Sequence, residues 1–397
     1  MRVLFAHDHH FIRLDGDVYS ESQFSAPSWQ RYLRVFDTLT VFAREGRLPP
    51  GKQKADLVLS SGPNISFALG PNLSSPMAQL RRRAEARNYL RQYLAEVDAV
   101  VARLPSELGL LAISEAERSG LPWAVEVVTC AWDALWNYGT VQGKLYAPVM
   151  AARMRGTVGN APFALYVTKE FLQRRYPNVT GNTVACSNVE IPVPSSVVLD
   201  QRLSRIAREP RPLVLGLIGT LRTRFKGIQT VLAALARIRH VLPPTEFRVL
   251  GSGDSSKWKD EAAAFGVADI VRFDGTLPSG DAVLNWLDNI DVYLQPSFQE
   301  GLPRALIEAM SRGCPAIAST CAGIPELLER DNLIRPGDVK HLAELLLRSA
   351  ADREWREVQA RRNWSMAGEY AKDKLEVRRQ RFFERFADYA AKRRSAR

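Results

Sequence analysis

Two glutamates stand eight positions apart in residues 297–319, which read SFQEGLPRALIEAMSRGCPAIAS. Glu300 comes directly before a Gly-Leu-Pro sequence, and Glu308 lies in the run PRALIEAMSRG, whose apolar spacing is that of a helix. Pro303 suits the first position of this helix, and Gly313 suits the residue just beyond its end. We therefore expect Glu300 on the loop before the helix and Glu308 on the helix's second turn.

The segment before Glu300, DVYLQPS, is typical of a buried strand, and open α/β sheets bind ligands at the carboxyl ends of their strands. At Gly301 a ligand can approach the backbone. Leu302 and Pro303 lead into the first turn of the helix, and the free N–H groups of that turn favour a phosphate. Because carboxylates repel phosphate, we expect the two glutamates to bind hydroxyl groups, which sugars and ribose supply. The pattern indicates a nucleotide diphosphate sugar.

The helix that carries Glu308 also allows a purely structural explanation. Arg304 and Glu308 stand at positions i and i+4, so they could form a surface ion pair worth about 0.2 to 0.5 kcal/mol. The buried side of the helix would consist of four apolar residues, Leu302, Leu306, Ala309 and Met310.

The length and composition indicate a globular protein with more than one core. The chain has 397 residues, of which 46% are hydrophobic and 24% charged, so we expect two domains of roughly 150 to 200 residues. Four cysteines without metal-ligand spacing indicate a reducing cytoplasm: Cys130, Cys186, Cys314 and Cys321. The apolar run before Asp8 is too short for a signal peptide, which again favours the cytoplasm.

The formal net charge is +11, and the last 47 residues hold 14 Lys and Arg against 8 Asp and Glu. Such a surplus fits a solvated basic surface or one of three anionic partners: nucleic acid, lipid headgroups or phosphorylated substrates. Nucleic acid ranks last because the chain has no nucleic-acid-binding motif with interleaved aromatic residues. An uncharged stretch at 60–80, expected to be a mobile loop, and an arginine-rich helix at 81–91 predict a surface that lies against anionic lipid.

Short β-rich apolar runs alternate with longer helix-like segments in both halves of the chain, which predicts parallel βαβ units in two tandem α/β sheets. The proline-rich stretch 191–212 suits a linker between them, with the boundary near 200 to 210. From Leu375 onward, apolar residues at helical spacing predict a final amphipathic helix. The expected domains are 1–200 and 201–375, with 376–397 as a helix that packs back on the first domain.

A second stretch with candidate binding residues is LIGTLRTRFKGIQTVLAAL at 217–235, after the first strand of the second domain. Together with PSFQEGLPRALIEAMSRGCPAIAS at 296–319, it resembles the retaining glycosyltransferases of family 4, a GT-B family, whose donor motif is PSxxEGxPxxxxEAMxxGxPVIAS. The resemblance extends over most of the chain and is strongest from about 213 to 340. It implies two Rossmann-like domains with parallel sheets that face a central cleft.

The resemblance also implies roles for single residues. Glu300 and the backbone after it would hold the donor sugar and its phosphate, and Glu308 would bind the ribose hydroxyls. Lys226 corresponds to the family's lysine that offsets the charge of the leaving diphosphate. Leu277 corresponds to the turn beside the nucleotide base.

One family residue is missing from this loop. The family usually has an arginine directly after the loop glycine, where this chain has Thr220. Arg222 or Arg224 could take its place as the second cation of the donor site.

The run HDHH at 7–10 follows the first predicted strand. We expect it at a sheet edge that faces the cleft, with His7 or His9 near the reacting sugar; plain loop histidines are the structural alternative. The run also resembles the DHH phosphoesterases, but the further Asp motifs of such a metal site are missing. The resembled glycosyltransferases often have a Gly-rich loop here, which this chain lacks. We expect no metal and no other cofactor.

The stretch VEVVTCAWDALWNYG ends a predicted strand with Trp132, Asp133, Trp136 and Tyr138. Aromatic faces stack on sugars and a carboxylate accepts their hydroxyl hydrogens, so these residues suit an acceptor or donor-sugar wall, with core packing as the alternative for the tryptophans. Many members of the resembled family have His-Asp here, and Trp132 stands where that histidine would be. We assign catalytic roles to Asp133 and, in the other domain, to Glu300 and Lys226.

The resemblance therefore implies a retaining glycosyltransferase of the hexosyltransferase type, with a UDP- or GDP-type nucleotide sugar as donor and a sugar or lipid-linked saccharide as acceptor. The stretch FALYVTKEFLQRRYP at 163–177 is similar to family members that assemble bacterial surface polysaccharides. We expect an enzyme of cell-surface polysaccharide or glycolipid assembly, in the cytoplasm and peripheral at the inner face of the membrane. The alternatives are a sugar-nucleotide epimerase and a non-catalytic nucleotide-sugar-binding protein of the same fold.

Overall fold

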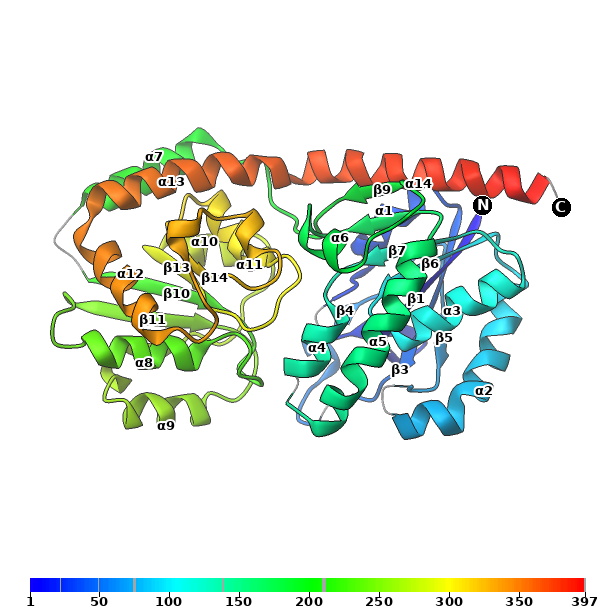
Figure 1. Cartoon of the computed structure of the whole chain (residues 1–397), viewed down its shortest axis with the longest axis horizontal. Coiled ribbons are helices and arrows are strands. Elements are labelled where there is room, and N and C mark those ends of the chain that lie inside the picture. The colour runs from blue at the N-terminus through cyan, green and yellow to red at the C-terminus, as the bar shows by residue number, and fades with distance from the viewer. Residues whose placement is uncertain (22, 49, 74–75, 138, 209–211, 396–397) are drawn as a thin grey trace. The chain divides into compact units, whose positions relative to one another are not determined.

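A computed structural model describes residues 1–21, 23–48, 50–73, 76–137, 139–208 and 212–395 (Figure 1). The chain divides into two compact α/β units. Unit 1 consists of Met1–Cys186 with Glu376–Arg397, and unit 2 consists of Ser187–Leu375. Among the described residues, no helix is both long and apolar enough to cross a membrane.

The core of unit 1 is a mainly parallel sheet in the order β5-β3-β1-β6-β7-β8-β9. Its strands are β1 Arg2–Leu14, β3 Thr38–Glu45, β5 Ile65–Gly70, β6 Ala99–Leu104, β7 Trp123–Val127, β8 Ala164–Tyr166 and β9 Thr183–Ala185. Two further strands are antiparallel: β2 Asp17–Ser20 pairs with β1, and β4 Val58–Leu59 pairs with β2. The helices are α1 Gln30–Leu33, α2 Pro76–Leu94, α3 Glu107–Arg118, α4 Ala131–Asn137, α5 Val141–Asn160 and α6 Phe171–Arg175.

Two predictions for unit 1 were wrong. DLVLSS at 56–61 is one of the short apolar runs that predict parallel strands, whereas β4 in this run has only two residues and is antiparallel. The stretch 60–80 was expected to be a mobile loop, but it contains the parallel strand β5 and the beginning of α2 at Pro76, a residue type that suits a helix's first position.

Unit 2 has a six-stranded parallel sheet in the order β12-β11-β10-β13-β14-β15. The strands are β10 Leu213–Ile218, β11 Thr245–Leu250, β12 Val271–Phe273, β13 Val292–Gln295, β14 Ala316–Ser319 and β15 Leu333–Ile334. The helices are α7 Ser196–Ala207, α8 Ile228–Ile238, α9 Ser256–Ala264, α10 Asp281–Asp288, α11 Arg304–Ser311, α12 Val339–Ala351 and α13 Arg353–Ala367. In Figure 1 the sheet of unit 2 lies between α8 and the pair α11 and α13. Counted along the chain, the strands have the doubly wound order 3-2-1-4-5-6.

The proline-rich stretch 191–212 is not the open linker that its composition predicts. It contains α7, which packs on α13. The buried guanidinium of Arg202 donates hydrogen bonds to the carbonyl oxygens of Arg312 at 3.0 Å and Leu287 at 2.9 Å. This stretch therefore belongs to unit 2, and the structure divides the chain after Cys186 rather than near 200 to 210.

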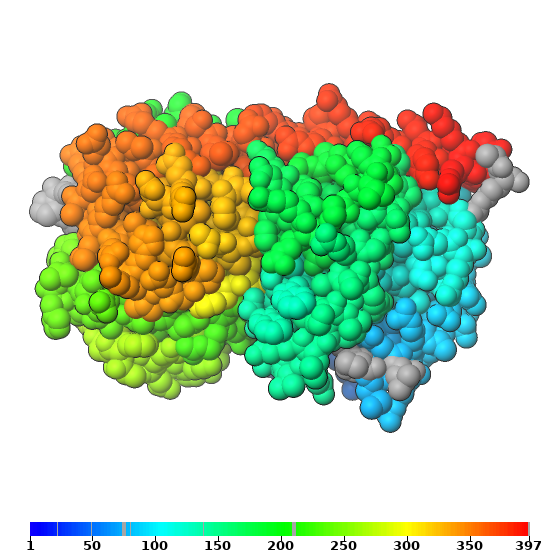
Figure 2. All heavy atoms as spheres, in the orientation of Figure 1, coloured from blue at the N-terminus to red at the C-terminus, as the bar shows by residue number. Residues whose placement is uncertain are grey.

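The last helix, α14 Lys372–Ser395, leaves unit 2 and joins unit 1 from Glu376 onward. Figure 2 shows its red atoms seated on the green and cyan atoms of unit 1. The contacts are aromatic, since Phe382 and Phe386 lie against Phe163 with ring centroids 5.9 and 5.6 Å apart. Near its end, the Arg394 guanidinium lies 2.8 Å from the Asp98 carboxylate.

Candidate functional site

The candidate site in unit 2 lies where the doubly wound sheet changes direction. Strands β10 and β13 are neighbours in the sheet, but the chain continues outward from them on opposite sides. The loops 219–227 and 296–303 follow the carboxyl ends of these two strands, so they flank the switch point at which such sheets bind ligands.

An ion pair joins the two loops. The Lys226 Nζ atom lies 2.7 Å from Glu300 Oε1, and both side chains are largely buried. The sequence motifs predict both residues in one donor site, and the structure brings their charged groups into contact. An ammonium group has three N–H donors, so this contact leaves donors of Lys226 for a ligand.

The close approach of the loops depends on two glycines. A Cβ atom at Gly219 would lie 2.6 Å from Lys226 Cγ, so the lysine chain occupies the space that a side chain would fill. Gly227 has a φ of +80° and would place a Cβ atom 2.1 Å from the Pro296 carbonyl oxygen. The loops are also joined by a 2.7 Å hydrogen bond from the Phe298 N–H to the Phe225 carbonyl.

Two polar residues that the sequence analysis did not single out hold Glu300. Gln295 Nε2 and Ser297 Oγ each donate a hydrogen bond of 2.8 Å to the same Oε1 atom that Lys226 contacts. Gln295 in turn accepts a 2.8 Å hydrogen bond from the Tyr293 hydroxyl. All three side chains are fully buried, so Glu300 is positioned by a buried polar network.

Glu308 lies on α11, as predicted, and its carboxylate has a different environment. Among the described residues, no side chain or backbone group donates a hydrogen bond to this carboxylate. Burial raises the pKa of the Glu308 carboxyl above its usual value, and the charge of Arg304 lowers it only in part. The negative charges of Glu308 and Glu300 both add to the burial-raised pKa of Tyr293. A half-buried carboxylate without donors is suited to accept hydroxyl hydrogens from a ligand.

The segment between the two glutamates contains the start of α11. Leu302 is buried, and the remaining expected stripe of Leu306, Ala309 and Met310 is buried as well, as predicted. Pro303 is the N-cap residue rather than the first helical residue, which shifts the start of the helix to Arg304. Gly301 accepts a 3.0 Å hydrogen bond from the Gly323 N–H. The unsatisfied N–H groups of the first turn of α11 therefore follow the Glu300 loop directly.

The two candidates for the second cation differ in their surroundings. Arg224 makes two 2.8 Å hydrogen bonds to the Glu261 carboxylate on α9, which already balances its charge. Arg222 is exposed, and its backbone N–H lies 3.3 Å from Thr220 Oγ1. Arg224 is therefore the weaker of the two candidates.

Leu277 lies on the exposed loop after β12 and is 40% exposed. The beginning of this loop is fixed, since Asp274 accepts hydrogen bonds from Arg248 Nε at 2.8 Å and Trp286 Nε1 at 2.7 Å. The loop is at the same edge of the sheet as the Lys226 loop, because β11 and β12 are parallel to β10.

The remaining site candidates belong to unit 1. His7 and His9 lie inside β1 and not on a loop after it, since β1 continues past a bulge between Ala6 and His10 and pairs with β2. His7 Nδ1 lies 3.0 Å from the Arg103 carbonyl, and His9 Nε2 lies 3.1 Å from Ser20 Oγ.

Both histidines are neutral at neutral pH. Burial lowers the pKa of His7 well below its ordinary value, with a further contribution from the Arg103 charge. Burial, followed by the charge of His10, lowers the pKa of His9 to about 4. The two rings lie against Phe24, with ring centroids 5.8 and 4.9 Å away, which is a packing role rather than an exposed one.

Trp132, Asp133 and Trp136 lie on α4, directly after the carboxyl end of β7. The two indole rings stack on each other at 5.5 Å with an interplanar angle of 14°, and Asp133 lies 3.9 Å from Arg175 Nη2. Within the described part of unit 1, no hydrogen bond, ion pair or ring contact joins these residues to His7 or His9. Tyr138 lies outside the described residues.

Three of the arginines expected to form a basic lipid-facing helix at 81–91 contact carboxylates of their own unit. Arg83 lies 3.6 Å from Glu107, and Arg87 and Arg91 lie 3.1 and 2.7 Å from Glu115. Both glutamates are buried. These arginines therefore balance buried charge, and the predicted basic surface is smaller than the sequence indicates.

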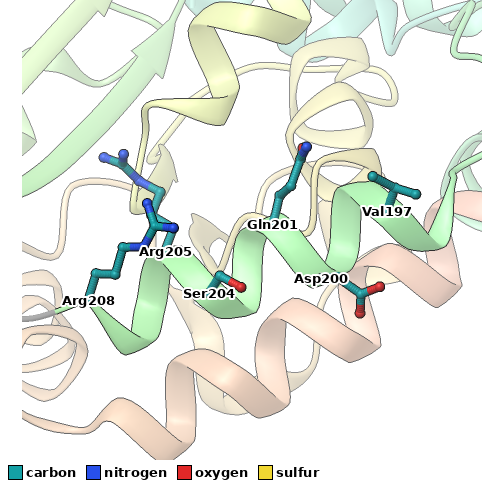
Figure 3. Close-up of a pocket in the computed structure, with 6 residues that line it drawn as sticks. All are labelled: Val197, Asp200, Gln201, Ser204, Arg205 and Arg208. Atoms are coloured by element: carbon teal, nitrogen blue, oxygen red, sulfur yellow. The ribbon is translucent and has the colours of Figure 1, made fainter.

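In the described ranges, no three His, Cys, Asp or Glu side chains are grouped closely enough to hold a metal ion. A shallow hollow of about 470 Å³ runs along α7, and Figure 3 shows its lining residues on that helix: Val197, Asp200, Gln201, Ser204, Arg205 and Arg208. One of them, Arg205, is bound to Asp291 at 2.8 Å. None belongs to the two loops of the switch point, so this hollow is not the candidate site.

Comparison with solved structures decides the fold. HepE from Anabaena, solved in complex with UDP-glucose, is 17% identical, with 98% of this chain and 100% of that chain covered and a TM-score of 0.65. The fold is GT-B. Residues 212–352 match the family model described as Glycosyl transferases group 1, and they include both loops of the candidate site.

Two curated relatives match over different lengths. Protein CapJ from Staphylococcus aureus is 28% identical over 381 residues, which cover 96% of this chain and 94% of CapJ. The amylovoran biosynthesis glycosyltransferase AmsK from Erwinia amylovora is 34% identical over 136 residues, which cover 32% of this chain and 33% of AmsK.

Proposed function

We propose that the protein is a retaining glycosyltransferase, similar to family 4, that transfers a hexose from a UDP- or GDP-type nucleotide sugar to a hydroxyl group. The observation that carries this proposal is the Lys226–Glu300 ion pair at the switch point, together with the Glu308 carboxylate that has no donor among the described residues. The pair offers a cation for a diphosphate, and the carboxylates offer acceptors for sugar hydroxyls. The likeness to HepE, which was solved with UDP-glucose, supports this choice of donor.

The donor would lie across the two loops of unit 2. Lys226 and the first-turn N–H groups of α11 offset the charge of the diphosphate, with Arg222 as the second cation. Glu300 is held by Gln295 and Ser297, so it keeps the ammonium in place and accepts a hydroxyl hydrogen of the donor sugar. Glu308 accepts the ribose hydroxyl hydrogens, and Leu277 lies beside the base.

In the reaction, the bond between the anomeric carbon and the phosphate oxygen breaks, and its electron pair goes to the diphosphate. The acceptor oxygen attacks the oxocarbenium-like carbon from the same face, and its proton goes to the leaving phosphate oxygen. Because negative charge grows on the diphosphate as the bond breaks, Lys226 stabilises the transition state more than the ground state. Since Lys226 and α11 supply this positive charge, we propose that no metal ion is needed.

The acceptor would bind on unit 1, with the stacked pair Trp132 and Trp136 as a wall for its sugar ring and Asp133 as the group that accepts a hydroxyl hydrogen. We propose a sugar or lipid-linked saccharide as acceptor, in bacterial cell-surface polysaccharide or glycolipid assembly. The likeness of the chain to AmsK, a glycosyltransferase of amylovoran biosynthesis, supports this setting. We propose that the enzyme works in the cytoplasm, at the inner face of the membrane.

The test begins with a thermal-shift screen of nucleotide sugars, because a specific ligand raises apparent stability. The best ligand is then incubated with the protein, with and without a saccharide acceptor, and the products are separated by chromatography. A retaining glycosyltransferase releases nucleoside diphosphate and forms a glycosylated acceptor with the anomeric configuration of the donor. Conversion of the nucleotide sugar without an acceptor would contradict the proposal and favour an epimerase.

A further inference from the structure

The outer face of α5 is apolar although it is exposed to solvent. Val141, Leu145 and Val149 are 73%, 73% and 50% exposed, and Pro148 and Ala152 between and after them are exposed as well. These five residues recur at a spacing of three or four, so they form one stripe along the helix. We call them the α5 stripe.

The opposite face of the same helix is apolar too. Ala147, Met150, Met154 and Val158 are buried in unit 1. A surface helix normally turns a polar face to water, and a helix that is apolar on both faces is usually covered on both. The α5 stripe therefore lacks the cover that its composition indicates.

One edge of the stripe is basic. Lys144 and Arg155 are both exposed and stand three helical turns apart on one edge, and α5 has no acidic residue anywhere along its length. Glu107, an acid that contacts α5, is bound by Arg153 of that helix at 2.8 Å, and Asp133 on α4 lies 3.9 Å from Arg175.

A tryptophan extends the stripe at its beginning. Trp136 on α4 is 45% exposed, and Lys144 Nζ lies 5.7 Å from its ring centroid. Gly143 permits this packing, since a Cβ atom there would lie 2.8 Å from the Leu135 carbonyl oxygen on α4. Apolar residues flanked by Lys and Arg, with Trp at the border, are the pattern of helices that lie in a membrane interface.

We propose that the α5 stripe, with Lys144 and Arg155, is the surface with which the protein binds an anionic lipid bilayer. The apolar residues enter the headgroup boundary while the two basic side chains contact lipid phosphates. This inference rests on the membrane location proposed above and replaces the basic face of α2, three of whose arginines bind Glu107 and Glu115. It does not involve the Lys226–Glu300 site.

The test is sedimentation of the full chain with vesicles of phosphatidylglycerol and phosphatidylcholine, and with vesicles of phosphatidylcholine alone. The double variant Leu145→Glu with Val149→Glu removes the apolar stripe, and we expect its partitioning onto the anionic vesicles to fall about tenfold or more. The control, Val179→Glu with Val241→Glu, adds the same charge at exposed valines outside the stripe and should bind like the wild type. A third variant, Lys144→Gln with Arg155→Gln, should lose the preference for anionic vesicles.

Equal binding of the stripe and control variants to the anionic vesicles would overturn the proposal. So would a wild-type protein that binds neither kind of vesicle. Sedimentation velocity without lipid provides a separate check. A wild-type dimer that the stripe variant converts to monomer would assign this face to a second copy of the chain instead. Calorimetry with UDP and GDP on the same variants separates this outcome from a failure of the donor site, because the stripe variant should bind nucleotide like the wild type.

Discussion

The Lys226 ammonium lies 2.7 Å from Glu300 Oε1, although the two residues are 74 positions apart in the chain. Each stands on the loop after one of the two strands that flank the switch point of the unit 2 sheet. The contact places a cation and a carboxylate within reach of one ligand at that edge. It is the geometry expected for a site that binds the phosphates and the hydroxyls of one molecule.

Replacing Lys226 with alanine removes the cation that faces the leaving diphosphate. We expect turnover to fall tenfold or more, which corresponds to about 1.4 kcal/mol of barrier. Steady-state release of nucleoside diphosphate measures this effect. Lys259→Ala, which removes an exposed lysine of α9 in the same unit, is the matched control and should keep wild-type turnover. If Lys226→Ala had wild-type kinetics, the role of Lys226 at the leaving diphosphate would be contradicted.

Glu308→Gln tests the assignment of the ribose contact. The glutamine keeps the size of the side chain but is a weaker acceptor than a carboxylate, so we expect affinity for the nucleoside diphosphate to fall about tenfold. The variant should also lose the wild type's preference for the ribonucleotide over its 2′,3′-dideoxy analogue. Calorimetric titration of both ligands into both proteins measures this. An unchanged preference would show that Glu308 contacts another part of the ligand.

The same substitution predicts a change in stability with pH. Burial raises the pKa of Glu308 in the folded protein, so its contribution to stability is present below the ordinary pKa of 4.5 and is lost as the pH rises through the raised value. The glutamine of the variant does not ionise, so it has no such dependence on pH. Without nucleotide, we expect Glu308→Gln to melt about 2 to 4 °C above the wild type at pH 7.5, with a smaller difference at pH 4. A lower melting temperature at pH 7.5 would contradict this.

Gly219→Ala tests the packing of the lysine. A Cβ atom at Gly219 would lie 2.6 Å from Lys226 Cγ, so the flexible lysine chain has to move and the ammonium loses its position. We expect turnover to fall about tenfold with a melting temperature within about 2 °C of the wild type, because displacement of a catalytic group costs rate more than stability. In Gly156→Ala a Cβ atom would meet no atom within 4 Å, so that variant should be fully active.

Much of the fold follows from the sequence because buried parallel strands are short apolar runs, and those runs became β1, β3, β6, β7 and β8 in unit 1 and all six strands of unit 2. The strands that were not predicted lack such an apolar run. β2 and β9 have four and three residues, and β5 lies in a stretch rich in serine, proline and glycine. The same limit applies to α7, which looked like a linker because of the prolines around it.

Local motifs indicated the residues of the candidate site that stand in them, but they did not indicate the contacts that depend on tertiary packing. Lys226, Glu300 and Glu308 stand in recognisable runs, whereas the donors that hold Glu300 come from Gln295 and Ser297. One signal for these was present, since Tyr293 and Gln295 are polar residues on the same side of an otherwise apolar strand. The pairing of Arg224 with Glu261 had no local signal, because it depends on how α9 packs.

The central claim is that Lys226 recognises the diphosphate of a nucleotide held at the switch point of unit 2. Calorimetric titration of nucleoside diphosphate and of the matching nucleoside, into wild type and Lys226→Ala, tests it most directly. The wild type should bind the diphosphate more tightly than the nucleoside by at least about tenfold, and Lys226→Ala should lose most of that preference while binding the nucleoside unchanged. The same preference in both proteins would contradict the claim.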